Sequence, residues 1–204
     1  CHLDRLDLSL YNDDLANVVQ AASDAKVDKL LCVSVTLKDF PSMVEKTKNF
    51  DNVMLTCGMH PLNQDDKVDI DNLRTLADDP AVIAIGETGL DYHYAPETKD
   101  IQLDSFKKHI HVAKELKKPL IIHTRSAQQD TLELLRAESA GEVGGIFHCF
   151  TESWDMAKQA IEMGFYISFS GIVTFKNASA LREVAKIVPD DRFMIETDAP
   201  YLAP

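Results

Sequence analysis

The chain has 204 residues, of which 45% are hydrophobic and 26% charged, a composition typical of one soluble globular domain. Its 33 acidic and 21 basic residues leave a formal charge of -12, which argues against tight binding to long duplex DNA or to an anionic membrane. No apolar run reaches the roughly 18 residues that a membrane span needs, and four scattered cysteines do not make a disulfide framework. We therefore expect a soluble, cytoplasmic protein with reduced thiols and no obligate protein partner.

Short apolar stretches alternate with longer amphipathic ones along the whole chain. Most of the short stretches lack an apolar-polar alternation, as expected for parallel strands that are covered on both faces. In chain order the pattern predicts helix 13–25, strand 30–35, helix 41–48, strand 53–57, helix 69–77, strand 82–85, helix 97–116, strand 120–123, helix 127–136, strand 145–150, helix 155–163, strand 165–170, helix 178–187 and strand 193–197.

Repeated β/α units in one domain leave two architectures, an open doubly wound sheet or an eight-stranded barrel. The first predicted helix begins near Asp13, so the residues before it read as the exit of a strand whose body would precede Cys1. That strand brings the total to eight, whereas a complete barrel usually needs about 250 residues. We expect residues 1–204 to form a single α/β domain, a (β/α)8 TIM-barrel catalytic domain of the metallo-dependent hydrolase type. It would be incomplete at both termini, lacking most of strand 1 and the C-terminal helices.

Polar side chains that suit a metal ion gather at the carboxyl ends of the predicted strands, where barrel enzymes carry their chemistry. They are His2, His60, Glu87, His123, His148 and Asp198. Imidazole and carboxylate together suit zinc, manganese or magnesium. Glu87 can bridge two ions about 3.5 to 4 Å apart, with His123 and His148 on one ion and His2 and Asp198 on the other.

Each of these residues also has a structural interpretation. In isolation His123 could be a histidine of the core, and Asp198 could cap a following helix. His148, however, repeats the arrangement of an apolar strand followed by histidine one β/α unit after His123. Glu87 follows an apolar strand, where an unpaired buried carboxylate would cost several kcal/mol, so a cation partner is the simpler explanation.

Three further residues are candidates for substrate binding. The planar fork of Arg125 matches a phosphate or a carboxylate, although a solvated surface role is the alternative. His60 lies on the predicted rim and could contact a substrate phosphate or serve only to order its loop. Tyr92, in a loop expected to overhang the rim, is a candidate to stack a terminal base.

Several motifs together resemble the TatD family of metal-dependent hydrolases, in particular its YcfH-type branch. They are Cys1-His-Leu-Asp, Gly58-Met-His-Pro, Gly86-Glu-Thr-Gly-Leu-Asp-Tyr, Ile122-His-Thr-Arg, Phe147-His-Cys-Phe and Glu196-Thr-Asp-Ala-Pro-Tyr-Leu-Ala-Pro. The resemblance implies a TIM barrel, two divalent ions (zinc, magnesium or manganese) and metal-dependent deoxyribonuclease activity, often exonucleolytic. Its metal ligands correspond here to His2, Glu87, His123, His148 and Asp198. The first histidine of the family's His-x-His pair is absent, because the chain begins at the residue between the two.

The function predicted from these observations is a deoxyribonuclease of the 3'-5' exonuclease type, with Asp198 accepting the proton of the attacking water and Glu87 bridging the ions. The net charge favours DNA ends or single strands as substrate over long duplexes. Two alternatives stay open. The same metal scaffold can hydrolyse an amide, an ester, a lactone or an aminoacyl-tRNA bond, and a chain without the first histidine can be a catalytically impaired or purely binding module.

Overall fold

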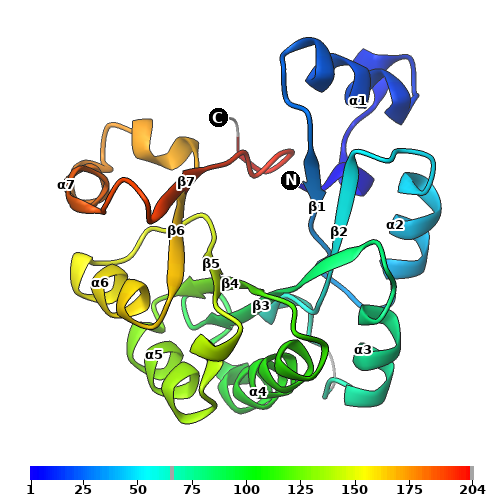
Figure 1. Ribbon diagram of the computed structural model, residues 1–204. Helices are drawn as coiled ribbons and strands as arrows, with labels where there is room; N and C mark the ends of the chain where they lie inside the picture. The colour runs from blue at the N-terminus through cyan, green and yellow to red at the C-terminus, as the bar shows by residue number, and fades with distance from the viewer. Residues whose placement is uncertain (65–66, 203–204) are drawn as a thin grey trace.

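The computed structural model describes residues 1–64 and 67–202, and its strands form one sheet in the order β1-β2-β3-β4-β5-β6-β7. Every neighbouring pair of these strands is parallel. The sheet curls around a central space, so that β1 and β7 come to flank the same opening (Figure 1). The strands are Leu30–Cys32 (β1), Val53–Cys57 (β2), Val82–Asp91 (β3), Leu120–Arg125 (β4), Gly145–Phe147 (β5), Phe165–Phe169 (β6) and Phe193–Ile195 (β7).

One helix precedes or follows each strand and covers the outer face of the curled sheet (Figure 1). The predicted apolar stripe of the longest helix is confirmed, because Phe106, Ile110 and Ala113 are completely buried. No helix of the described part of the chain is long and apolar enough to cross a membrane. The helices are Leu15–Asp24 (α1), Phe40–Thr47 (α2), Ile70–Ala77 (α3), Lys99–Leu116 (α4), Gln128–Ala137 (α5), Trp154–Glu162 (α6) and Ser179–Ile187 (α7).

Strand β3 is six residues longer than the sequence pattern predicts, and it continues to Asp91. Its second half pairs with β4 from Thr88 opposite Ile122 to Asp91 opposite Arg125, after a shift of register that begins at Ile85. The polar and glycine-rich segment that follows Ile85 was expected to lie beyond the strand, because it lacks an apolar run. Its pairing with β4 keeps it extended, so Glu87 lies on a strand and not in a loop.

The first two residues lie between β1 and the segment that follows β7. The amide of Val33 donates to the carbonyl of Cys1 at 2.9 Å, and the amide of His2 donates to the carbonyl of Ala199 at 2.8 Å. The amino terminus accordingly lies close to β1, at the opening between the two edges of the sheet (Figure 1). This is the place that the strand preceding the first helix was expected to occupy.

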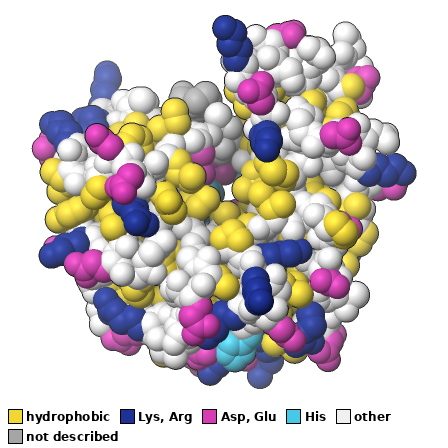
Figure 2. Space-filling model, viewed as in Figure 1, with side chains coloured by type: hydrophobic (Ala, Val, Ile, Leu, Met, Phe, Trp, Pro, Cys, Tyr) yellow, Lys and Arg dark blue, Asp and Glu magenta, His cyan; other side chains and the backbone are white. Residues whose placement is uncertain are grey.

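Large apolar side chains fill the layer between sheet and helices. Phe147 packs edge-to-face against Phe165 and Phe150, with ring centroids 5.5 Å and 6.4 Å apart, and all three rings are almost fully buried. The centre of the molecule, by contrast, is hollowed, and hydrophobic side chains border the hollow (Figure 2). The apolar core therefore lies between the sheet and the helices, while the space inside the curled sheet is open.

A buried histidine of α4 orders the loop that follows β2. His109 is completely buried, and its Nδ1 lies 2.8 Å from the carbonyl oxygen of Ser105. Its Nε2 accepts a hydrogen bond from the amide of Met59 at 3.0 Å, so Nδ1 carries the proton. Burial, with a smaller effect from the charge of Lys108, lowers the pKa of His109 to about 4. The neutral ring holds the residue next to His60 in place.

Stability should therefore depend on pH through His109. Because the folded-state pKa lies below that of the unfolded chain, the unfolded chain binds more protons between about pH 6.5 and pH 4, and the stabilisation is lost as pH falls. In urea titrations, the stability advantage of the wild type over His109→Gln should shrink by ~3 kcal/mol between pH 7 and pH 4. All other titrating groups are the same in the two proteins, so their effects cancel in the comparison. A difference in stability between wild type and variant that does not change with pH would contradict the low pKa of His109.

Candidate metal centre

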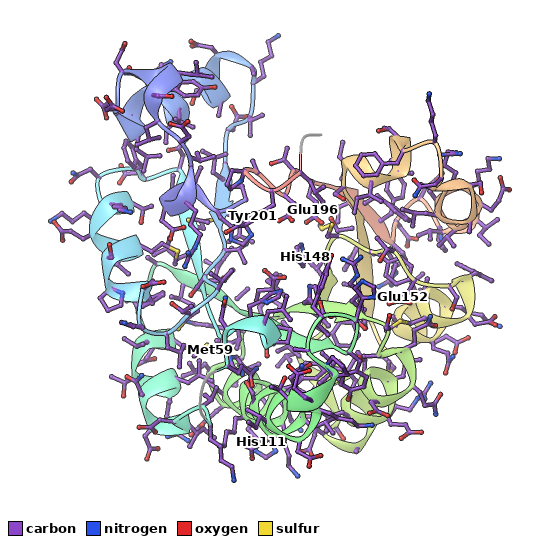
Figure 3. The ribbon with its side chains drawn as sticks, turned by 180° about the vertical axis from the view of Figure 1, so that it is seen from behind. Met59, His111, His148, Glu152, Glu196 and Tyr201 are labelled. Carbon is purple, nitrogen blue, oxygen red and sulfur yellow. The ribbon has the colours of Figure 1, made fainter. Side chains whose placement is uncertain are left out.

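Three histidines surround one oxygen of a buried carboxylate at the carboxyl ends of neighbouring strands. Glu87 of β3 is 3% exposed. Its Oε1 lies 2.7 Å from Nε2 of His148, 3.3 Å from Nδ1 of His123 and 3.4 Å from Nε2 of His60. His60 follows β2, His123 belongs to β4 and His148 follows β5, so four adjacent strands position the group. Figure 3 shows His148 directed into the interior, while His111 of α4 lies on the outer face.

Two glycines on either side of Glu87 allow β3 to approach its neighbours closely. A Cβ on Gly89 would overlap the carbonyl oxygen of His123, and one on Gly86 would clash with Ile121. Both residues also have positive φ angles, of 137° and 147°, which favour glycine. The sequence Gly-Glu-Thr-Gly therefore brings Glu87 and His123 together.

The charges of the cluster stabilise one another. Burial alone would raise the pKa of Glu87, but the neighbouring charges of His148 and His60 and hydrogen bonds from His123 and His148 outweigh burial and hold its pKa well below the ordinary range. Burial likewise opposes protonation of His148, yet the charge of Glu87 and the hydrogen bond to Glu196 raise the pKa of His148 well above its usual value. The ring nitrogens and the carboxylate therefore form a site that a cation can enter by displacing protons.

Two acidic residues that the sequence analysis did not select as site residues contact the histidines through the ring nitrogens. Nε2 of His123 lies 3.0 Å from Oδ2 of Asp91, which is completely buried, and Nδ1 of His148 lies 3.4 Å from Oε1 of Glu196. Such carboxylates orient metal-binding imidazoles and increase their basicity. The period of two along β3 places Asp91 on the same face as Glu87, but the sequence offers that signal only once the strand is known to continue to Asp91.

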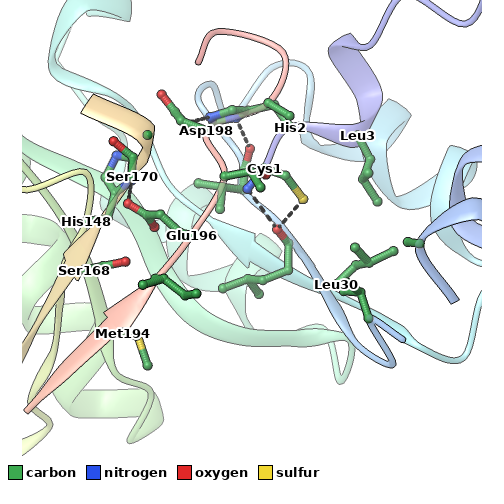
Figure 4. A pocket seen from close by; sticks show the side chains of 18 of the residues that line it. Cys1, His2, Leu3, Leu30, His148, Ser168, Ser170, Met194, Glu196 and Asp198 are labelled. Carbon is green, nitrogen blue, oxygen red and sulfur yellow. Dashed lines mark hydrogen bonds and ion pairs between the residues drawn. The ribbon is translucent and has the colours of Figure 1, made fainter. Parts of the chain in front are cut away.

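A second pair, His2 and Asp198, lies on the other side of the interior. Nε2 of His2 is 3.3 Å from Oδ1 of Asp198, and its Nδ1 is 2.8 Å from the carbonyl oxygen of Val33 (Figure 4). Burial raises the pKa of Asp198, but the hydrogen bond with His2 and the charge of His148 lower it below the usual value overall. His2, His148, Glu196 and Asp198 all line one cavity of about 980 Å³. Of the cluster around Glu87, His148 therefore shares this cavity with His2 and Asp198.

The three residues predicted to bind substrate are placed differently from one another. His60 joins the cluster itself, since it approaches Glu87 about as closely as His123 does. Arg125 is exposed at the end of β4, and its Cζ lies 4.6 Å from the centroid of the Tyr94 ring. Tyr92 donates its hydroxyl proton to Asp130 at 2.7 Å and is not directed at the cluster by any contact among the described residues.

The donor atoms fit a divalent cation. One ligand atom from each of His60, Glu87 and His123 lies within 4.8 Å of the other two, and imidazole and carboxylate donors suit zinc and related ions. The grouping includes His60, which was expected to bind substrate, and it brings together histidine and glutamate side chains from separate strands.

Comparison with known proteins agrees with this arrangement. The family model described as "TatD related DNase" matches residues 1–204. The chain is 50% identical over 204 residues to the uncharacterized metal-dependent hydrolase YcfH of Escherichia coli K12, and this match covers 100% of the chain and 77% of YcfH. It is also 31% identical over 202 residues to the 3'-5' ssDNA/RNA exonuclease TatD of Salmonella typhimurium, covering 98% of the chain and 78% of that protein.

The fold is that of solved structures of the same kind. The crystal structure of YjjV, a TatD homologue of Escherichia coli K12, superimposes with a TM-score of 0.88 at 25% identity and covers 98% of this chain and 77% of that one. The phosphotriesterase homology protein of Escherichia coli, at 17% identity, shares the fold with a TM-score of 0.64 over 95% of this chain and 78% of its own. The prediction of an α/β barrel is confirmed. The chain belongs to the TatD family of metal-dependent hydrolases.

Proposed function

We propose that this hydrolase cleaves phosphodiester bonds of DNA as a 3'-5' exonuclease and uses two divalent ions. The observation that carries the proposal is the single buried oxygen of Glu87, which three histidines face. One of them, His148, lines a cavity together with the separate pair of His2 and Asp198. One relative of this chain is named a 3'-5' ssDNA/RNA exonuclease, which supports the polarity and the substrate.

Glu87 would bridge the two ions, with His123 and His148 on one of them and His2 and Asp198 on the other. The donors suit zinc, manganese or magnesium. When bound, such ions supply Lewis acidity toward the phosphoryl oxygen and the attacking water. Asp91 and Glu196 would keep the rings of His123 and His148 in their orientations.

Asp198 is the proton acceptor in this proposal. Its lowered pKa keeps the carboxylate ionised at neutral pH, and its side chain, 16% exposed, lines the cavity. It can therefore receive the proton of the water that attacks phosphorus. His60 lies against Glu87 and would contact the phosphate from the side of β2. Arg125 would hold a further phosphate oxygen with its planar fork, since no carboxylate of the described residues pairs with it.

The substrate is bound as an end or a single strand. With a formal charge of -12, the protein neutralises few phosphates outside the cavity. We also infer a cytoplasmic location, because all four cysteines are free thiols, as is usual in that compartment.

Loss of one ligand should reduce the bound metal. We expect His123→Ala to hold fewer divalent ions per chain than the wild type, which should hold two, after dialysis against Mn²⁺ or Zn²⁺ and elemental analysis. His111→Ala removes an exposed histidine of α4 that pairs with Glu138 outside the site, and it should retain the wild-type content. Equal metal content in the two variants would rule out the ligand assignment.

The chemistry is tested with end-labelled oligonucleotides. The wild type with Mg²⁺, Mn²⁺ or Zn²⁺ should shorten single-stranded DNA from its 3' end, and Asp198→Asn should slow this by at least ~100-fold, because the proton acceptor is lost. Parallel assays with ester, amide and aminoacyl-tRNA substrates cover the alternative reactions. Hydrolysis of one of those substrates with no phosphodiester cleavage would overturn the nuclease proposal.

Binding of single-stranded DNA should depend only weakly on salt. If one or two phosphates are neutralised, raising the salt concentration from 50 to 200 mM should weaken binding less than ~10-fold, as expected for so few released counterions. Fluorescence anisotropy with a labelled oligonucleotide measures the slope. A loss of a hundredfold or more would show instead that many phosphates are contacted.

A further inference from the structure

An exposed pair of planar side chains lies beside the candidate metal centre, at the carboxyl ends of β3 and β4. Tyr94 is 60% exposed. The guanidinium of Arg125 lies over this ring, with Cζ 4.6 Å from its centroid. His93 contacts the same ring at an angle of 77°, with centroids 4.6 Å apart. We call Tyr94 and Arg125 the rim pair.

The rim pair is attached to the metal centre through one buried carboxylate. Oδ1 of Asp91 accepts hydrogen bonds from the amides of His93 at 3.0 Å and Tyr94 at 2.9 Å. Oδ2 of the same residue contacts Nε2 of His123 at 3.0 Å. The loop that carries Tyr94 is therefore held in a defined position relative to the metal centre, even though the ring itself is exposed.

The neighbouring tyrosine does not offer the same surface. Tyr92 is half-buried, its hydroxyl donates to Asp130, and Nζ of Lys99 lies 5.0 Å from its ring centroid. Lys99 and Tyr92 share the carboxylate of Asp130, so the ring is held against α4 and α5. Of the two tyrosines in this loop, Tyr94 has the accessible ring.

We infer that the rim pair is a stacking platform for a nucleobase of single-stranded DNA whose phosphate is held at the metal centre. Aromatic rings and guanidinium planes stack bases of any sequence. With a formal charge of -12 the protein as a whole repels phosphates, so stacking on the rim pair supplies affinity that the overall charge does not. The choice of DNA rests on the proposed function, but the platform itself rests on the exposed geometry of Tyr94 and Arg125.

The test compares binding of two ten-residue single strands by fluorescence anisotropy in the presence of Mn²⁺, one of thymidines and one of abasic residues, both with the same cleavage-resistant phosphorothioate linkages. We expect the wild type to prefer the strand with bases. Tyr94→Ala should weaken binding of that strand about tenfold and leave binding of the abasic strand unchanged. Tyr94→Phe, which keeps the ring, should stay within about twofold of the wild type.

Tyr166→Ala is the matched control. Tyr166 of β6 is 38% exposed and also lies under an arginine, with Cζ of Arg192 5.4 Å from its ring centroid. Arg192 directly precedes β7, so this pair lies at the end of the strands opposite the metal centre. Its loss should leave binding of both strands unchanged.

The results of the binding and cleavage assays test the stacking platform and the nuclease activity independently of each other. If Tyr94→Ala binds like the wild type, or if the wild type binds both strands equally or neither, the stacking inference is overturned, whatever the protein cleaves. Tyr94-dependent preference for bases without any phosphodiester cleavage would leave the platform intact and overturn the proposed function instead. Cleavage together with Tyr94-dependent binding is the result expected from both.

Discussion

The burial of one carboxylate is the constraint on which the rest of the site depends. Glu87 is 3% exposed, and an ionised carboxylate so deep in a protein costs several kcal/mol unless positive partners surround it. The partners are His60, His123 and His148, and each is supplied by a different strand. The sheet must therefore keep its register across four strands for the charge to be compensated, and the close approach at Gly89 is part of that register.

A second layer of contacts links this cluster to the core and to the rim. Asp91 joins His123 to the loop of Tyr94, Glu196 contacts His148 from the segment after β7, and His109 holds the residue next to His60 from within α4. Each link is a hydrogen bond of a mostly buried group, so the loops that frame the cavity are oriented by the same scaffold that packs the interior. The histidine cluster and the loop of Tyr94 are consequently held in place by the same few side chains.

The curvature of the sheet brings together residues from the two ends of the chain, which local structure cannot do. His2 and Asp198 are 196 residues apart in the chain, yet their side chains are 3.3 Å apart because the two edges of the curled sheet flank the same opening. A flat sheet would have kept them at opposite edges. His2 and Asp198 line the same cavity as His148 of the histidine cluster only because β1 and β7 flank the same opening.

The sequence by itself determined the alternation of strands and helices and the residue types at the strand ends, because apolar periodicity is local and the carboxyl ends of parallel strands meet at one edge. The convergence of His60, Glu87, His123 and His148 followed from that rule. Only the tertiary structure decided that β3 continues to Asp91, that Asp91 and Glu196 support the histidines, and that Tyr94, and not Tyr92, presents an exposed ring. These features depend on a shift of register and on side-chain contacts between strands and helices far apart in the chain, and no local pattern of residues specifies them.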